Sequence, residues 1–177
     1  MFHRLADAFG YAVTAAVVGL PVSSAAANFS LYGYDSESAF GARSLFYKGG
    51  HVLLANHTSP DLIPIYFESG HEDGTETIRS VHANMTGTPP FSRGTLQLPN
   101  TNDHQYITVQ NAPDAAPSQV RILVYGHTIL VNDAGILSAS FYAEEADTAG
   151  VWYLVWEPNK NEAGNLERVF LRNRRLA

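Results

Sequence analysis

Acidic residues and a histidine gather between residues 68 and 76, and they are the residues of this chain with the clearest catalytic potential. The segment contains Glu68, His71, Glu72 and Asp73. A glycosidase needs two carboxylates roughly 5–10 Å apart across a cleft. Glycines surround these residues, however, so the segment first predicts a solvated turn. Its spacing does not follow the EF-hand order, and we expect no metal site.

A second pair of carboxylates occurs near the C-terminal third, where Glu144 and Glu145 are adjacent. In a strand, adjacent side chains point to opposite faces, so this pair would not act on one substrate. One hypothesis is nevertheless a secreted hydrolase or lyase with a site built from acidic residues. Its candidate acid and base residues are Glu68, His71, Glu72, Asp73, Glu144 and Glu145.

Known catalytic motifs are missing from the chain. The histidines are scattered, without an H-x-H or H-E-x-x-H pattern, and no G-x-S-x-G, G-x-G-x-x-G or P-loop sequence occurs. The chain has no cysteine, which excludes cysteine nucleophiles and cysteine-ligated zinc. We therefore predict no cofactor, and the sequence assigns no catalytic residue.

Aromatic residues offer a different chemistry, since an exposed ring can stack on a sugar. Carbohydrate is accordingly the first ligand that we consider, although aliphatic neighbours on both faces of 151–156 favour core packing for that segment. The candidate ligand-binding aromatics are Tyr32, Tyr34, Tyr47, Tyr66, Trp152 and Tyr153.

The elements that must position these residues are β-strands. Residues 44–48 and 51–55 flank Gly49-Gly50, which predicts a hairpin. Gly126-His127 predicts a second hairpin, and a clear turn covers residues 132–135. Further strands are expected at 29–34, 62–68, 75–82, 94–98, 106–110, 136–144, 151–157 and 168–172, with a helix conceivable only at 140–149.

Short strands at near-regular spacing predict one all-β domain, either an antiparallel β-sandwich of jelly-roll type or a barrel. In the strand 151–156, Trp152, Leu154 and Trp156 would share one face. Val151, Tyr153 and Val155 would share the other. Both faces are apolar, so we expect this strand to be central and covered on both sides.

The first 27 residues have the layout of a secretory signal peptide. A positive residue, Arg4, precedes the uncharged apolar run 9–20, and Pro21 and the small residues 24–27 follow. The run is shorter than the roughly 20 residues of a spanning helix. We predict cleavage after Ala26 or Ala27, a single domain at 28–177, and secretion to the medium or the cell wall.

Composition limits the partners. The formal net charge is −6 and the chain has only two lysines, which predicts neither nucleic-acid nor anionic-membrane binding. The exception is a basic C-terminal tail containing Arg168, Arg172, Arg174 and Arg175. We predict a solvated end for it, with a processing site or an anionic cell-wall contact as alternatives.

Three N-x-[ST] triplets begin at Asn28, Asn56 and Asn84. Asn56 and Asn84 lie beside expected turns, where an attached glycan would be solvated. These two asparagines are therefore the predicted glycosylation sites. Asn28 is less suitable, because cleavage after Ala27 would make it the terminal residue.

Five segments together resemble a group of small secreted β-rich proteins of filamentous fungi, largely uncharacterised. They are residues 28–34 after the leader, 45–50, 51–55, 151–156 and 169–172. The resemblance implies a secreted fungal β-protein and supplies no catalytic residues. The chain departs from the group in its charged loop at 69–76 and in its arginine-rich end.

These observations favour a secreted, non-enzymatic protein that binds carbohydrate or another cell-wall component. The secreted hydrolase or lyase is the alternative. Exposure of the aromatics and convergence of the carboxylates are the structural features that distinguish the two hypotheses.

Overall fold

The computed structural model describes residues 28–35, 41–83, 94–99, 105–110, 121–157 and 166–173. All regular structure in these ranges is β, as the sequence predicts. The leader, Asn84, Arg174 and Arg175 lie outside the described residues. The strands are β1 (Asn28–Phe29), β2 (Tyr32–Asp35), β3 (Arg43–Lys48), β4 (His51–Ala55), β5 (Ile63–Glu72), β6 (Thr75–Ala83), β7 (Thr95–Gln97), β8 (Gln105–Tyr106), β9 (Thr108–Gln110), β10 (Arg121–Tyr125), β11 (Thr128–Asp133), β12 (Ile136–Ser138), β13 (Phe141–Glu145), β14 (Val151–Trp156) and β15 (Glu167–Arg172).

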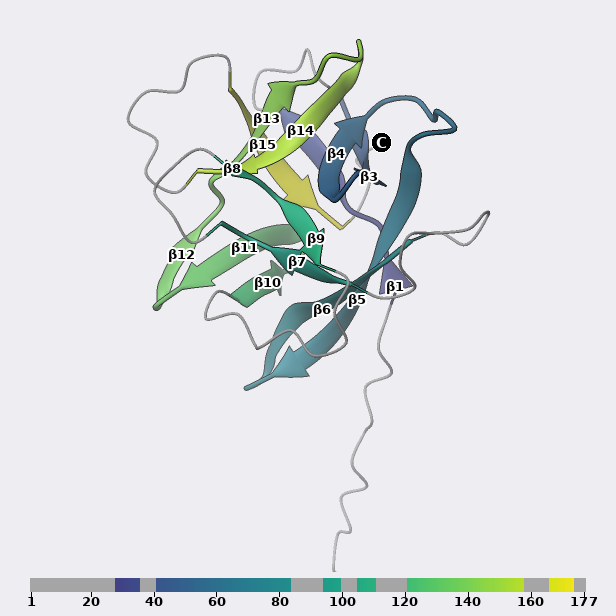
Figure 1. Ribbon diagram of the computed structural model, residues 1–177. Helices are drawn as coiled ribbons and strands as arrows, with labels where there is room; N and C mark the ends of the chain where they lie inside the picture. The colour runs from purple at the N-terminus through teal and green to yellow at the C-terminus, as the bar shows by residue number, and fades with distance from the viewer. Residues whose placement is uncertain are drawn as a thin grey trace, which may run out of the picture.

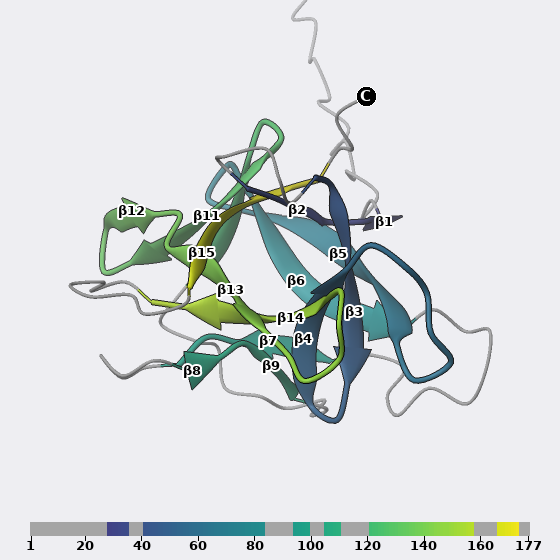
Figure 2. The same cartoon turned by 90° about the horizontal axis from the view of Figure 1, so that it is seen from above.

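The strands form one antiparallel sheet that closes on itself (Figure 1). Pairing of β3 with β4 and of β11 with β15 completes a ring of nine strands, in the order β3-β5-β6-β10-β11-β15-β13-β14-β4. Figure 2 shows these strands arranged around a common interior. Of the two predicted architectures, the chain therefore adopts the barrel. Strand β2 lies between β3 and β15 and hydrogen-bonds to both.

The predicted turns are confirmed where their residue chemistry is explicit. Gly49 and Gly50 join β3 to β4 with φ angles of 59° and 95°, values that favour glycine over other residues. Residues 126 and 127 join β10 to β11. In the turn between β11 and β12, the Gly135 N–H donates to Asn132 Oδ1 at 2.8 Å.

Two local predictions were wrong. The charged segment 69–76 is not a loop: its turn is confined to Asp73 and Gly74, both at positive φ, and its other residues extend β5 and β6. Residues 29–34 do not form one strand: β1 pairs with β5, whereas β2 pairs with β3 and β15. The strand predicted at 136–144 is present as two strands, β12 and β13, and residues 141–145 form β13 and no helix, because their alternate side chains face the interior.

Strand β14 has the predicted double burial. Leu154 and Trp156 belong to the interior core, against which Trp152 also packs. Val151 belongs to a second apolar cluster with Phe46, Leu53, Ala55 and Leu62, and Tyr153 packs against that cluster. Because Leu53 and Tyr153 are register partners, this second cluster covers the outer side of β3, β4 and β14.

A short segment between residues 105 and 110 fills the gap where β4 and β14 diverge. The two strands pair directly only from Leu53 to Ala55. Beyond that point, the Ile107 N–H donates to the Leu154 carbonyl at 2.8 Å, and the Ile107 carbonyl accepts from the Val52 N–H at 3.0 Å. The Ile107 side chain is buried in the interior core. The neighbouring side chain, Tyr106, therefore faces outward.

The C-terminal arginines do not form a solvated end throughout. Arg168 and Arg172 belong to β15, which pairs with β2, β11 and β13. Val169 and Leu171 face the interior core from this strand. Alternation then places Arg168 and Arg172 on its outer side.

Gly33 marks the closest packing of the wall between β2 and its neighbours. A Cβ atom at this position would lie 2.8 Å from Leu54 Cδ2 and 2.9 Å from Val169 Cγ1. Both of these side chains are fully buried. Only a residue without a side chain fits here without displacing the core.

We predict that Gly33→Ala lowers the free energy of unfolding by about 1–3 kcal/mol because of this overlap. Urea denaturation provides the measurement. Val169→Ala removes one of the overlapping methyl groups. The double variant should therefore be more stable than the sum of the single effects implies, by about 0.5–3 kcal/mol. Strict additivity would contradict the close approach.

Candidate functional site

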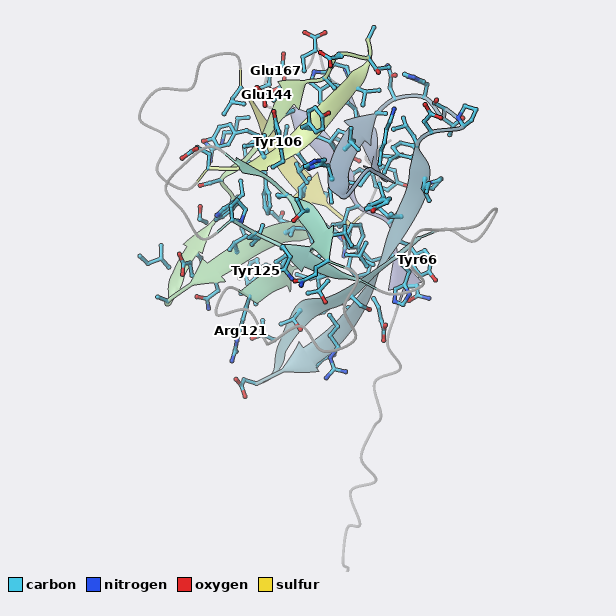
Figure 3. All side chains as sticks on the ribbon, viewed as in Figure 1. Tyr66, Tyr106, Arg121, Tyr125, Glu144 and Glu167 are labelled. Carbon is cyan, nitrogen blue, oxygen red and sulfur yellow. The ribbon has the colours of Figure 1, made fainter. Side chains whose placement is uncertain are left out.

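Four side chains from four strands meet on the outer side of the barrel: His51 of β4, Tyr106 of β8, Glu144 of β13 and Tyr153 of β14. We call them the aromatic–acidic cluster. Each is partly buried. Figure 3 shows Tyr106 and Glu144 next to each other at one end of the molecule, well separated from Tyr66.

The rings of the aromatic–acidic cluster have defined geometry. Tyr106 and Tyr153 stack with their centroids 4.5 Å apart and their planes at 30°. His51 meets both edge-on, at centroid distances of 5.5 Å to Tyr106 and 5.6 Å to Tyr153. Stacked and edge-to-face contacts are the favourable arrangements of aromatic rings. The three rings therefore fix one another's orientation.

Tyr106 also contacts the carboxylate of the cluster. Its hydroxyl donates a hydrogen bond to Glu144, and this bond is the largest cause that raises the pKa of Tyr106 to about 12. Partial burial and the negative charges of Glu144 and Asp147 act in the same direction. Tyr106 is therefore neutral, and a hydrogen-bond donor, throughout the physiological pH range.

Strand register explains why these residues meet. Glu144 and Tyr153 are opposite each other in the β13–β14 pair. Tyr106 is opposite Val155, two residues farther along β14. His51 is opposite Thr108 in the β4–β9 pair. Three strand pairings, two of them made by the inserted segment 105–110, are thus needed to assemble the cluster.

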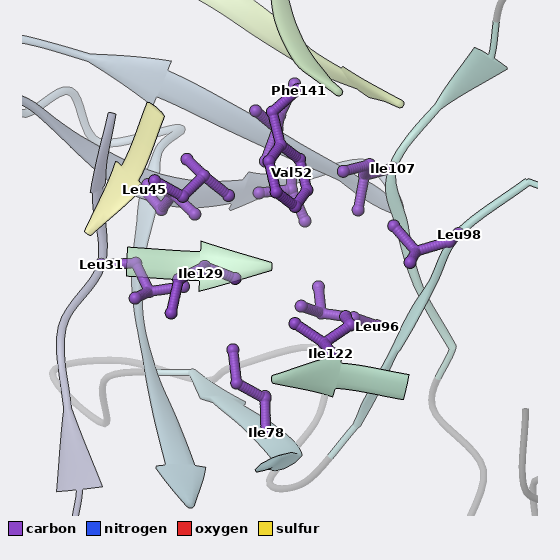
Figure 4. A pocket seen from close by; sticks show the side chains of 12 residues that line it. Leu31, Leu45, Val52, Ile78, Leu96, Leu98, Ile107, Ile122, Ile129 and Phe141 are labelled. Carbon is purple, nitrogen blue, oxygen red and sulfur yellow. The ribbon is translucent and has the colours of Figure 1, made fainter. Parts of the chain in front are cut away.

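The barrel interior does not provide a second site among the described residues. Its void is about 10 Å³, at the lower limit of what one water molecule needs. Figure 4 shows the side chains around it, all of them apolar. Such a space has neither the volume nor the polar groups to bind and orient a ligand. Chemistry in the described part of the chain is therefore on the outer face and at the rims.

The predicted aromatics are distributed over separate parts of the barrel. Tyr153 belongs to the aromatic–acidic cluster, whereas Tyr47 packs against the interior core. Tyr66 stacks on His82 at 4.9 Å. Tyr32 and Tyr34 lie on the outer side of β2, because Gly33 between them faces the core. None of these residues is fully buried.

Trp152 lies beneath a buried arginine at one rim of the barrel. The Arg43 guanidinium carbon is 3.7 Å from the centroid of its ring, and Arg43 is only 7% exposed. Burial lowers the pKa of Arg43, and the nearby Glu167 acts in the opposite direction. This cation–π pair covers the ring of Trp152, so the residue is not a platform for a flat ligand.

Glu68 participates in a polar cluster on β5 and β6. Ser80 Oγ donates to Glu68 Oε2 at 2.8 Å, and His82 Nε2 lies 3.1 Å from the same oxygen and 2.9 Å from Ser80 Oγ. These residues are the types of a catalytic triad. However, one imidazole nitrogen contacts both partners, and Ser80 is only 2% exposed. Ser80 is therefore not accessible as a nucleophile.

The six predicted acid and base residues do not converge on one site. His71 and Asp73 are exposed near the β5–β6 turn, and Asp73 forms an ion pair with Arg121 at 3.3 Å. Glu72 is also in β5, but its side chain is outside the described set. Glu144 and Glu145 point to opposite sides of β13, as predicted from their adjacency. No group of three potential metal ligands occurs among the described residues.

From the sequence, Tyr153 is a candidate ligand-binding residue and Glu144 a candidate acid or base, whereas Tyr106 is a candidate for neither role. His51 is one of several scattered histidines in the sequence. The available signal was a period of two: Tyr106 precedes the apolar Ile107, and His51 precedes Val52. That pattern places both side chains outward, but it does not say which strands lie beside them.

Asn56 is exposed directly after the end of β4, and the His57 Nδ1–H donates to its side-chain oxygen at 2.9 Å. A glycan attached to Asn56 would extend into solvent, which is compatible with the predicted glycosylation.

No protein-family model and no curated protein matches this chain. The described part of the chain contains no helix with the length and apolarity to cross a membrane. The site's own chemistry is therefore the basis for the proposal below.

We expect Glu144→Gln to lower the pKa of Tyr106 from about 12 towards its ordinary value of 10.0, because the charge and the strongest hydrogen-bond acceptor disappear together. Ultraviolet absorbance of tyrosinate during an alkaline titration measures the change. Glu145→Gln, on the opposite face of β13, is the matched control. In the unmodified protein, the Tyr106 contribution to stability should decline between about pH 10 and pH 12, because the unfolded chain ionises first.

Proposed function

We propose that this protein is a secreted, non-enzymatic carbohydrate-binding protein whose ligand contacts the aromatic–acidic cluster. The observation that carries the proposal is the stacked pair Tyr106–Tyr153 beside the carboxylate of Glu144. Aromatic rings fixed by their neighbours bind a flat apolar surface at low entropic cost. A carboxylate at their edge accepts hydrogen bonds from hydroxyl groups.

A sugar presents both of these features. One face of a pyranose ring consists of C–H groups, which pack on an aromatic ring, whereas its edge carries hydroxyl groups. In the cluster, Glu144 offers acceptor oxygens and Tyr106 offers a hydroxyl. The same cluster has neither a buried cationic group nor an apolar pocket among the described residues, so a neutral sugar fits its chemistry best.

The non-enzymatic character is supported by how the carboxylates are arranged. Glycoside hydrolysis needs two of them on either side of one bond. Glu144 is the cluster's only carboxylate, since Glu145 points to the other side of β13. Asp147, exposed in the turn after β13, affects Tyr106 only through its charge. The hydrolase alternative therefore depends on Glu144 and Asp147 acting as a pair.

We predict that Tyr106→Ala weakens binding to the preferred neutral polysaccharide by about 2- to 10-fold, the value of one aromatic contact of about 0.5–1.5 kcal/mol. Glu144→Gln should weaken it through loss of a charged acceptor. Pull-down with insoluble chitin, β-glucan and cellulose selects the polysaccharide, and calorimetry with its soluble oligomers gives the affinity. Tyr66→Ala, on β5, is the matched control.

Equal affinity of the Tyr106→Ala variant and the unchanged protein would refute the proposed site. Incubation with the same oligomers separates binding from hydrolysis. If new reducing ends appear, and Glu144→Gln or Asp147→Asn abolishes them, the protein is a hydrolase whose acidic site includes Asp147, which is not among the candidates predicted from the sequence.

The secreted part of the proposal is supported by the leader and the apolar run of residues 9–20. We predict that the protein exported by a fungal host begins at Ala27 or Asn28. N-terminal sequencing of the protein purified from the culture medium is the measurement. An exported chain that begins at Met1, or a chain retained in the cells, would contradict cleavage.

A further inference from the structure

A second surface of distinct chemistry covers the outer side of β2, β15 and the end of β10. We call it the arginine–aromatic face. Gly33 on β2, and Val169 and Leu171 on β15, face the core. Because side chains alternate along a strand, the neighbouring side chains of β2 and β15 point outward. It consists of Tyr32, Tyr34, Tyr125, Arg168, Phe170 and Arg172.

Each arginine of this face lies near an aromatic ring. The guanidinium carbon of Arg168 is 5.2 Å from the centroid of Phe170, and that of Arg172 is 5.9 Å from the centroid of Tyr34. Both distances are within the range of cation–π attraction. Each ring restricts the orientation of its guanidinium group without neutralising the positive charge.

Strand register joins these residues into continuous rows. Tyr125 is opposite Thr128, Thr128 is opposite Arg172, and Arg172 is opposite Tyr32. Phe170 is opposite Tyr34 in the neighbouring row. Tyr125 is 75% exposed, the largest exposure among the large hydrophobic residues described. The face is therefore open to a partner at the Tyr125 end.

The charge of this face is opposite to that of the protein as a whole, which is −6. Within the described residues, neither Arg168 nor Arg172 forms an ion pair. The acidic residues of β2 and β15 are Asp35 and Glu167. They lie on the same side of their strands as Gly33 and Val169, which is the side opposite to the arginine–aromatic face. Two guanidinium groups are thus left to attract an anion from solution.

We infer that the arginine–aromatic face binds an anionic polysaccharide of the uronic-acid type. A guanidinium binds a carboxylate through two parallel hydrogen bonds, and exposed rings pack against sugar C–H groups. The two arginines are four positions apart, about 13 Å along β15. A polymer with one carboxylate per sugar, less densely charged than a nucleic acid, can present carboxylates at this spacing. A nucleic acid, with a charge every 1.7 Å or so of duplex, would meet strong repulsion from the rest of the protein.

This inference does not depend on the proposed function, because it rests on different residues and a different ligand charge. The two surfaces are nevertheless adjacent. Arg168 is opposite Tyr142, Tyr142 is opposite Val155, and Val155 is opposite Tyr106. The outer wall from β2 to β8 can therefore contact a neutral and an acidic glycan side by side.

The test measures binding of the full chain to polygalacturonate at low and high salt. Arg168→Gln and Arg172→Gln should each weaken binding about fivefold, and the double variant about 25-fold. Salt should weaken binding by the unchanged protein more than by the double variant. The matched control is Arg121→Gln. Arg121 is an exposed arginine of β10 that forms an ion pair with Asp73.

Arg168 is exposed, so its single variant tests the inference even if the Arg172 variant unfolds. Unchanged affinity of Arg168→Gln would overturn it, as would an equal loss with Arg121→Gln. Tighter binding of a single-stranded oligonucleotide than of polygalacturonate would assign the face to nucleic acid instead. The Tyr106→Ala variant should bind polygalacturonate normally while binding the neutral polysaccharide more weakly, so the two proposals fail separately.

Discussion

Two backbone hydrogen bonds at Ile107 hold together the part of the barrel on which its candidate chemistry depends. They join one residue to Leu154 on β14 and to Val52 on β4, where those strands no longer reach each other. Buried backbone groups without partners are costly, so the diverging strands require such an insertion. The same insertion presents Tyr106 to Tyr153 and Glu144. The backbone hydrogen bonds that complete the wall and the contacts that assemble the aromatic–acidic cluster therefore depend on the same segment, residues 105–110.

Among the described residues, closure of the sheet separates an apolar interior from an outer side that carries most of the polar chemistry. Side chains alternate along every strand, so each apolar residue in the core leaves an outward neighbour available for other roles. On β13, β14 and β8 these neighbours form an aromatic–acidic cluster. On β2 and β15 they form an arginine–aromatic face. With no cysteine in the chain, stability comes from the apolar interior and the hydrogen-bonded wall.

Local patterns predicted the elements, but not the neighbours of each element. Gly49-Gly50 and the period of two in 151–156 specify a hairpin and a doubly buried strand without reference to distant residues. Tyr106 and Glu144 could not be paired in advance, because their contact depends on which strands lie on either side of β14. A turn is predicted in the Gly-flanked segment that contains Asp73 and Gly74, and the structure has one there. The extension of β5 and β6 up to this turn is not predicted, because the charges on either side of it suggest a loop.

Pairing of β2 with β15 places one of the first strands beside the last. The wall therefore closes only when nearly the whole chain has been made, and β2 gains one of its two partners only from the last strand. Contacts so distant in sequence slow folding, since the entropy of a long loop is lost before the contact forms. For the secretion that we propose, this delay would be useful, because translocation through a secretory channel requires an unfolded polypeptide. In this topology, the barrel closes only when its last strand, β15, is in place.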